Sequence, residues 1–425
     1  MPSNEAPMTE IDVAIEDLAE ESIELLTRLV AESSTVGQEQ GAIDVLAAAM
    51  EELGFESERI PFSAGHIPGP IAGVAPVLGD GASQERYQLL AVSPGTGPIK
   101  LLLNGHIDVV PAAETDLWTN EPFEPTRRDG RMYGRGAGDM KCGFAIGHLA
   151  LAALLRTHPD LFRTQRIGLL AVIEEECTGN GALVAGRAGA IGNEVLILEP
   201  TDLGVMIGGV GVLWIEMRVF GRSSHAQAAD RSGNAIELGM QVIAALQTWS
   251  ADLAISHPDP ELRATGELYT VNVGEVHAGD WVSSAPGSAT FGVRVGFPRG
   301  WTADQAESEV REVIRTASQG FPLEPAVALT GFRAPGYLVD PDGPLVRDLV
   351  EAHRDAHGSD PDLFSLGSTT DARTFLHEFD VPAACYGAVV HDMHGVDENV
   401  ELDSIAAAAR TVARFILTRF DGGVS

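Results

Sequence analysis

The sequence predicts an α/β fold in which a mostly parallel sheet is flanked by helices and is interrupted by an inserted ferredoxin-like α+β domain. Two observations predict it. In the first and last parts of the chain, short apolar runs alternate with helical segments, which is typical of parallel sheets covered by helices. The middle of the chain follows the order β-α-β-β-α-β, which is that of a ferredoxin-like unit. We therefore expect a discontinuous α/β domain at residues 1–211 and 332–425 and a second domain at residues 212–331.

The first part of the chain predicts two helices followed by alternating strands and helices. Apolar residues recur at helical spacing over Ile15–Val30 and Ala42–Leu53, and Gly54 ends the second helix. Buried strands are expected at four short apolar runs, Tyr87–Val92, Lys100–Leu103, Ile167–Ile173 and Val195–Leu198. Further helices are expected at Gly143–Arg156 and after Gly181.

The rest of the chain changes pattern twice. The inserted domain is expected to have strands at Val212–Phe220, Leu268–Val276, Ser288–Val295 and Ala326–Thr330 and helices at Asn234–Thr248 and Thr302–Ser318. After Gly331 the α/β alternation resumes. Helices are expected near Pro344–His357, Thr370–Glu378 and Leu402–Arg419, around a strand at Ala383–Tyr386.

The composition excludes several classes of partner. The 425 residues contain 28 Lys and Arg against 61 Asp and Glu, which gives a net charge of −33, and 44% of them are apolar. Such a chain can build folded cores, but its charge repels phosphate backbones and anionic lipids, and no basic run opposes that repulsion. We therefore expect no nucleic-acid and no membrane partner. Whether the acidic surface reflects adaptation to high salt stays open.

The cysteines and the first residues indicate a cytoplasmic protein. Cys142, Cys177 and Cys385 cannot all pair, and their spacing matches no zinc ribbon or redox motif. The chain begins with an acidic segment that does not resemble a signal peptide, and no apolar run approaches about 18 residues. These features predict a reducing, cytoplasmic environment.

Acidic and imidazole side chains follow the predicted strands at their carboxyl ends. His106 and Asp108 lie two residues apart, so that in a strand they would face the same way. Glu174, Glu175 and Glu176 follow Ile167–Ile173, and Glu199 follows Val195–Leu198. Asp139 precedes a helix in a glycine-rich turn, and His394 lies in HDMHGVDENV.

Each of these fragments alone also fits an ordinary role: a surface histidine, a helix cap or a solvated acidic turn. Together they would meet at one edge of the sheet, where open α/β folds place their sites. Two histidines and three carboxylates suit a pair of divalent metal ions with one bridging carboxylate, and the absence of cysteine from the set favours hydrolysis on a metal such as zinc. The five residues are His106, Asp139, Glu176, Glu199 and His394.

The chain resembles the co-catalytic zinc hydrolases that include acetylornithine deacetylase, succinyl-diaminopimelate desuccinylase, aminoacylase and the bacterial glutamate carboxypeptidase. The resemblance covers nearly the whole chain. It rests on the stretches GHIDVVPA, WTNEPFEPTRRDGRMYGRGAGDMKCG, EEECTGNGA, LEPT, GRSSHAQAADRSGNAI, the segment from GEVHAG to VRVGFP, GSTTDAR and HGVDENV. It implies that the inserted domain is a lid through which the protein forms a homodimer.

The resemblance also implies roles for the site residues. His106, Asp139 and Glu199 would hold one metal ion, and Asp139, Glu176 and His394 the other, with two divalent ions per subunit, most simply zinc, with cobalt or manganese as alternatives. Aligning EEECTGNGA on its closing Gly181–Ala182 makes Glu175 the general base and Glu176 a ligand. Asp108 would orient the ring of His106.

In the lid, the resemblance implies that His225 reaches the active site, often that of the partner subunit, and polarises the substrate carbonyl. Asn272 and Arg294 would contact the substrate, and the arginine fork suits a carboxylate. The backbone at Gly367 would approach the substrate. Taken alone, His225 also fits a surface histidine, Arg294 a strand arginine and Gly367 an ordinary turn glycine.

The expected function is hydrolysis of an N-acyl amino acid, as in acetylornithine deacetylase, by a dimetal-activated water with Glu175 as general base. The alternative is a metallo-dipeptidase or a glutamate-type carboxypeptidase on the same dimetal site. The expected partner is thus a small-molecule N-acyl amino acid or dipeptide. A non-catalytic relative is disfavoured because all five ligands and the base are present. The acyl group and the side-chain preference stay open.

Overall fold

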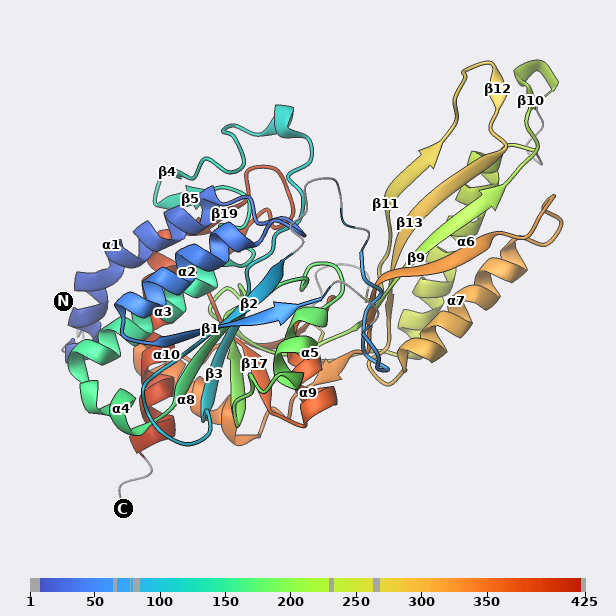
Figure 1. Cartoon of the computed structure of the whole chain (residues 1–425). Helices are drawn as coiled ribbons and strands as arrows, with labels where there is room; N and C mark the ends of the chain where they lie inside the picture. The colour runs from blue at the N-terminus through green and yellow to red at the C-terminus, as the bar shows by residue number, and fades with distance from the viewer. Residues whose placement is uncertain are drawn as a thin grey trace, which may run out of the picture.

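The chain forms two lobes, a larger one that carries both ends of the chain and a smaller one that projects from it (Figure 1). The computed structural model describes residues 8–63, 67–76, 78, 85–228, 233–262 and 268–421. Residues 229–232 of the stretch GRSSHAQAADRSGNAI lie outside these ranges. None of the described helices combines the length and the apolar character needed to cross a membrane.

The larger lobe is built on a nine-stranded mixed sheet in the order β1-β2-β6-β3-β7-β17-β8-β15, with β16 beside β8. Its four central strands run parallel: β6 (Ile167–Val172), β3 (Leu101–His106), β7 (Glu194–Ile197) and β17 (Ala383–Cys385). Antiparallel strands flank them, namely β1 (Glu56–Phe62) and β2 (Arg86–Val92) on one side and β8 (Val205–Gly209) and β15 (Tyr337–Leu338) on the other. Strand β16 (Leu363–Leu366) is parallel to β8. The predicted α/β class is confirmed.

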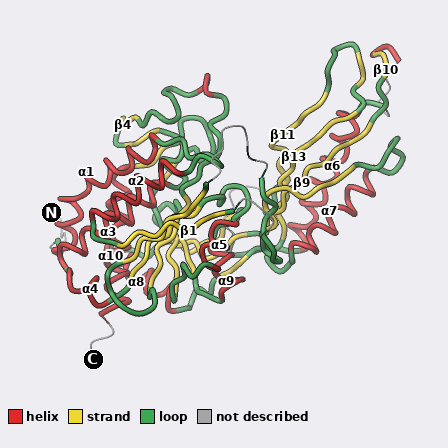
Figure 2. The backbone as a smooth tube through the Cα atoms, viewed as in Figure 1, coloured by secondary structure: helices red, strands yellow, loops and turns green. Residues whose placement is uncertain are grey.

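Helices cover both faces of this sheet, which is why β3 and β6 are buried along their whole length. On one face pack α1 (Glu10–Ala31), α2 (Gln40–Glu52), α3 (Lys141–Thr157), α8 (Pro344–His357) and α10 (Leu402–Asp421), with α4 (Pro159–Thr164) after α3. On the other lie α5 (Asn180–Arg187) and α9 (Ala372–Phe379) (Figures 1 and 2). Helix α1 begins with a capping box between Thr9 and Asp12.

A small antiparallel sheet lies beside the large one and was not predicted. It consists of β18 (Val390–His391), β19 (Asn399–Glu401), β5 (Arg131–Tyr133) and β4 (Thr126–Arg128), and the 3₁₀ helix η1 (Thr115–Leu117) precedes it. Strand β19 pairs with β5, so that Asn399 lies opposite Tyr133. The sheet thereby brings the segment that contains Asp139 next to the segment that contains His394.

The smaller lobe contains a four-stranded antiparallel sheet in the order β11-β13-β9-β14. The strands are β11 (Val271–Ala278), β13 (Ser288–Phe297), β9 (Gly211–Phe220) and β14 (Ala326–Ala334), and the helices are α6 (Ala235–Ser256) and α7 (Ala303–Ala317). Its core includes Leu213, Ile215 and Phe291 and is separate from that of the larger lobe. This arrangement confirms the predicted lid fold. Because β14 continues to Ala334, the proposed boundary at residue 331 falls within a strand.

A short two-stranded ribbon extends from the outer end of the lid (Figure 1). It pairs β10 (Ser224–His225) with β12 (Ser284–Ala285), and the 3₁₀ helix η2 (Ala226–Ala228) follows β10. The figure shows that this ribbon lies on the side of the lid away from the larger lobe. His225 is therefore carried far from the large sheet of its own chain.

Candidate metal centre

Five ionisable side chains meet at the carboxyl edge of the parallel strands. His106 is the last residue of β3, Glu176 follows β6 and Glu199 follows β7. Parallel strands end at the same edge, so these three side chains lie together. Asp139 precedes α3 and His394 lies between β18 and β19. The structure thus brings together all five candidate metal ligands that the sequence singled out.

The first group of donors is His106, Asp139 and Glu199, whose ligand atoms all lie within 4.8 Å of one another. His106 Nε2 lies 3.0 Å from Asp139 Oδ1 and 3.8 Å from Glu199 Oε1. His106 and Glu199 are buried. This group is therefore compact and largely closed to solvent.

The second group is Asp139, Glu176 and His394, which also fall within 4.8 Å of one another. His394 Nε2 lies 3.2 Å from Asp139 Oδ2 and 3.1 Å from Glu176 Oε2. Asp139 therefore presents one oxygen to each histidine and belongs to both groups. This is the geometry that a carboxylate shared by two cations requires.

The carboxylates of the centre favour positive charge on the groups beside them. Burial opposes protonation of His106, but the carboxylates of Glu199 and Asp139 outweigh it and raise the pKa of His106 well above its usual range. Likewise, Asp139 and Glu176 outweigh burial and raise the pKa of His394 to about 11. The carboxylates thus favour the positively charged form of both imidazoles. Two divalent cations would supply that charge instead, and nitrogen and carboxylate donors suit zinc-like ions.

Glu175 lies at the edge of the centre and belongs to neither group. Its Oε2 is 3.9 Å from His106 Nε2. Burial raises the pKa of Glu175 well above its usual range, and Glu199 and Asp371 raise it further although His106 opposes them. A buried carboxyl group that holds its proton more tightly than usual is suited to acid–base chemistry.

Asp108 holds two segments of the site at once. Its main-chain carbonyl accepts a hydrogen bond of 2.9 Å from His106 Nδ1, which leaves Nε2 free to face the donor groups. Its carboxylate accepts hydrogen bonds from the backbone amides of Glu175 (3.3 Å) and Glu176 (3.2 Å) and lies 3.9 Å from His106 Nδ1. The sequence suggested that the side chain orients the ring, but in the structure the main chain does so. Burial raises the pKa of Asp108 to about 7.

Glu174, the first of the three glutamates, is directed away from the centre. Its carboxylate pairs with Arg86 at 2.5 Å and accepts a hydrogen bond of 2.9 Å from Thr178 Oγ1. Arg86 also pairs with Glu39, and all three charged groups of this network are buried. The run of glutamates is thereby divided into one that anchors the loop and two that reach the centre.

Asp371 is a site residue that the sequence analysis missed. It lies in the stretch GSTTDAR, just before α9, and is 1% exposed. Burial raises its pKa to about 6, and its charge in turn raises the pKa of Glu175 and Glu199. The only signal for Asp371 in the sequence is its place in GSTTDAR, the stretch that begins with Gly367.

Three of the four candidate substrate contacts lie together, and His225 does not. Arg294 on β13 is opposite Asn272 on β11. Arg294 Nη2 donates a hydrogen bond of 3.0 Å to the carbonyl of Gly367, which joins the lid to the larger lobe, and Nη1 donates to Thr270 Oγ1. His225 is exposed on the outer ribbon of the lid, where its Nδ1 accepts from the backbone amide of Gln227.

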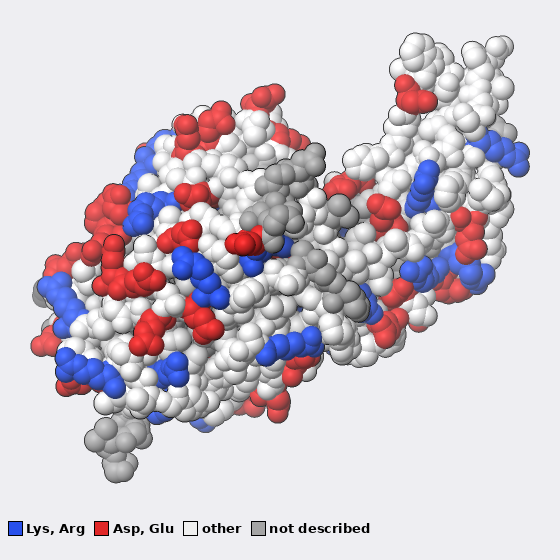
Figure 3. Space-filling view, viewed as in Figure 1, with Lys and Arg blue, Asp and Glu red and all other residues white. Residues whose placement is uncertain are grey.

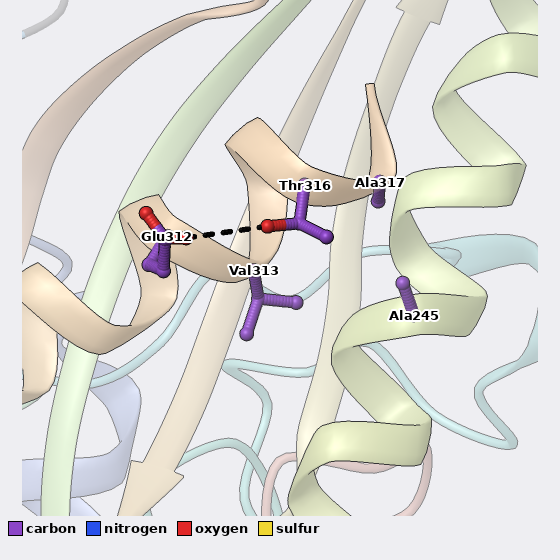
Figure 4. Close-up of a pocket in the computed structure, with 5 residues that line it drawn as sticks. All are labelled: Ala245, Glu312, Val313, Thr316 and Ala317. Carbon is purple, nitrogen blue, oxygen red and sulfur yellow. Dashed lines mark hydrogen bonds between the residues drawn. The ribbon is translucent and has the colours of Figure 1, made fainter. Parts of the chain in front are cut away.

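A separate hollow of about 260 Å³ lies between α6 and α7, on the helical face of the lid (Figure 4). It is lined by Ala245, Glu312, Val313, Thr316 and Ala317. The hydrogen bond drawn in the figure between these residues runs from Thr316 Oγ1 to Glu312 Oε1 over 3.3 Å. The hollow contains none of the residues of the metal centre.

Comparisons with known proteins give one consistent result. Residues 102–418 match the family described as Peptidase family M20/M25/M40. A succinyl-diaminopimelate desuccinylase of Methylorubrum extorquens is 32% identical over 388 residues, which are 88% of this chain and 93% of the relative.

Two solved structures share the fold at 15% identity. The di-peptidase Dug1p from Saccharomyces cerevisiae aligns with a TM-score of 0.76 over 98% of this chain and 99% of its own. Human carnosine dipeptidase 1 aligns with a TM-score of 0.73 over 96% and 99%.

Proposed function

Because the chain belongs to peptidase family M20/M25/M40 and is thus a dinuclear metallohydrolase, a deacylase or a peptidase, we propose that it removes the acyl group from an N-acyl amino acid. One observation carries the proposal. Asp139 is shared between two groups of metal donors, and the buried Glu175 lies beside them without belonging to either. That arrangement suits hydrolysis of an amide by water.

The proposed cofactor is a pair of divalent cations per subunit, with Zn²⁺ first and Co²⁺ or Mn²⁺ as alternatives. His106, Asp139 and Glu199 would hold one ion, and Asp139, Glu176 and His394 the other. When bound, such ions supply Lewis-acid charge and lower the pKa of water at the site. All five donors already lie within reach of one another at the ends of elements and in the loops beside them, so little reorganisation is required to bind the ions.

Glu175 is the proposed general base. It takes a proton from the attacking water at Oε and later delivers that proton to the leaving amine. Burial and the neighbouring carboxylates support this role because they raise the pKa of Glu175 above its usual range, so that the carboxyl group holds a proton more readily than an exposed one. Asp108 fixes the backbone of Glu175 and so aims its side chain.

Arg294 is the proposed anchor for the substrate carboxylate, with Asn272 beside it and the Gly367 backbone across from it. A guanidinium binds a carboxylate through two parallel hydrogen bonds. The hydrogen bond from Arg294 in the lid to the carbonyl of Gly367 in the larger lobe supports this role.

His225 is proposed to polarise the substrate carbonyl in the partner subunit of a homodimer that forms through the lid. In its own chain it lies on the outer ribbon, so a second copy is needed to bring it to a metal centre (Figure 1). Strand β11 is an edge strand, and the exposed Trp281 and Val282 follow it. Figure 3 shows few charged side chains at this end of the lid on the face drawn, which favours contact with another copy.

The acyl group is proposed from the relatives. Since the relative from Methylorubrum extorquens is a succinyl-diaminopimelate desuccinylase, we place succinyl amino acids first and acetyl amino acids second. We also propose a cytoplasmic location, in agreement with three free, buried cysteines.

The experiment that tests the function is a substrate panel. The purified protein is loaded with Zn²⁺, Co²⁺ or Mn²⁺ and incubated with succinyl, acetyl and formyl amino acids, dipeptides and glutamate conjugates, and the released amine is measured. Release from acyl amino acids by the native protein, and not by Glu175→Gln, supports the proposal. Release from dipeptides or glutamate conjugates alone would establish the alternative, a metallo-dipeptidase or carboxypeptidase. No release by protein that contains two metal ions would overturn both.

A further inference from the structure

We propose that Glu398 and Arg135 form a positioning pair that holds two of the proposed metal ligands, Asp139 and His394, at a set separation. The hydrogen bonds of the pair to the two ligand segments all go to main-chain atoms, so it acts through the main chain. This inference rests on the proposed function, because it assigns the pair a role in holding metal ligands.

Glu398 binds the backbone at Asp139, the candidate ligand that both donor groups share. It is 0% exposed, and its Oε1 accepts hydrogen bonds from the backbone amides of Gly138 and Asp139, each at 2.9 Å. Two consecutive amides on one oxygen fix the orientation of the peptide that carries Asp139. The approach is close, since a Cβ at Gly138 would lie 3.1 Å from Val390 Cβ and 3.3 Å from Glu398 Oε1, and a larger residue there would press on both side chains.

Arg135 links Glu398 to the loop of the other ligand. Its Nη1 pairs with Glu398 Oε2, and its Nη2 donates hydrogen bonds of 3.1 Å to the carbonyls of His394 and Gly395. Its guanidinium lies 5.3 Å from the ring centre of Trp118 and is shielded from solvent. One carboxylate and one guanidinium therefore connect the backbones of Asp139 and His394, which are 255 positions apart in the sequence.

General stabilisation does not account well for this pair. Desolvation of a buried carboxylate and guanidinium offsets most of their attraction, so such pairs are weak sources of stability. The neighbouring strands β5 and β19 carry a half-buried pair of the same type, Arg131 with Glu401 at 3.2 Å, which among the described residues makes no hydrogen bond to the backbone of Asp139 or of His394. Partners that orient metal ligands commonly change metal affinity when they are replaced.

Asp108 makes the same kind of contact to backbone amides elsewhere in the centre. Its carboxylate accepts the amides of Glu175 and Glu176, just as Glu398 accepts those of Gly138 and Asp139. In both cases a carboxylate that belongs to neither donor group holds the backbone of a segment that carries candidate ligands. Glu398 and Arg135 determine the geometry of the second group, whereas Asp108 spans both.

The test is a titration of metal-free protein with Co²⁺ against a competing chelator, in native protein, Glu398→Gln and Arg135→Lys. Glutamine keeps an acceptor for the amides but turns an N–H₂ group toward Arg135. Lysine has a single nitrogen in place of the two that contact Glu398 and the carbonyls separately. We expect one of the two Co²⁺ ions to bind about 10–100-fold more weakly in each variant, with a smaller change for the other. The visible spectrum of Co²⁺ should change for the weakened ion, and excess Co²⁺ should restore kcat while KM stays near the native value.

The matched controls are Arg315→Lys and Glu312→Gln, an exposed ion pair on α7 of the lid, which should leave both Co²⁺ affinities unchanged. Circular dichroism checks the fold, and if Glu398→Gln does not fold, Arg135→Lys carries the test because it keeps the charge. Native-like Co²⁺ affinity in the folded variants, or equal weakening of both ions, would overturn the positioning pair alone. Failure of the native protein to bind two Co²⁺ ions would overturn the proposed function and this inference with it.

Discussion

The carboxylate of Asp108 accepts a hydrogen bond of 3.3 Å from the backbone amide of Glu175. The strand that ends in His106 is thereby tied to the loop that carries the proposed base. Replacing Asp108 with Asn should lower kcat by about 10–100-fold, because the amide nitrogen of Asn cannot accept one of the two backbone hydrogen bonds. Steady-state kinetics check this, with the exposed Asp116→Asn on η1 as the control. Native kcat in Asp108→Asn would show that the contact does not position the base.

Glu175→Gln should lower kcat by about 10²–10⁴-fold and leave two metal ions bound, because glutamine keeps the shape but cannot accept the proton. Elemental analysis measures the metal content and steady-state kinetics measure kcat. Glu176→Gln is the comparison, and it should lose an ion. Loss of metal from Glu175→Gln instead would mean that the roles of Glu175 and Glu176 are exchanged.

His225→Ala should bind two metal ions and be nearly inactive, because the carbonyl would lose a donor outside the metal centre. If His225 works across a dimer, an equal mixture with Glu175→Gln should recover about one quarter of the native activity, since half the dimers would then contain one intact site. The released amine is measured after the subunits have exchanged. A mixture that stays as inactive as its components would argue for a site completed within one chain.

Arg294→Lys should raise KM for a carboxylate-bearing substrate by about 10–100-fold, because lysine cannot form the paired hydrogen bonds of a guanidinium. The same variant should change KM little for an ester or amide of that substrate, which lacks the charge. Arg222→Lys, an exposed arginine elsewhere in the lid, is the control. Equal effects on the charged and uncharged substrates would remove Arg294 from carboxylate recognition.

His148 should make the stability of the larger lobe depend on pH. Burial lowers the pKa of His148 from its ordinary 6.5 to about 4, and its Nδ1 lies 3.0 Å from Ser22 Oγ. Between about pH 6.5 and 4, His148 is protonated in the unfolded chain but not in the folded protein. The free energy of unfolding therefore decreases as the pH falls through this range. Thermal melts across this range check the slope, and it should be smaller in His148→Gln. The exposed His277→Gln should melt like the native protein, and an equal slope in all three would exclude His148 as the cause.

The helices and the central strands could be predicted because their signals are local. Helix α3 and strand β6 each carry their pattern within one short stretch, and the ends of β3, β6 and β7 put His106, Glu176 and Glu199 on the same edge. Strands β1 and β8 were missed. β1 contains Pro61 and is largely exposed, and β8 ends in two glycines, so the local strand signal of both is weak. They form strands because they pair with neighbouring strands of the sheet.

The sequence alone determined the class of the fold and indicated five candidate metal donors, because these follow from periodic patterns and from the places of the residues next to predicted elements. The candidate base, Glu175, follows from the resemblance of EEECTGNGA to the hydrolase family. The contacts that make these residues one site depend on the folded chain. The pairing of β19 with β5 joins Asp139 to the segment of His394, Arg86 directs Glu174 away from the centre, and the lid holds His225 apart from its own site. These contacts link residues far apart in the chain, and no local pattern of sequence encodes which of them will meet.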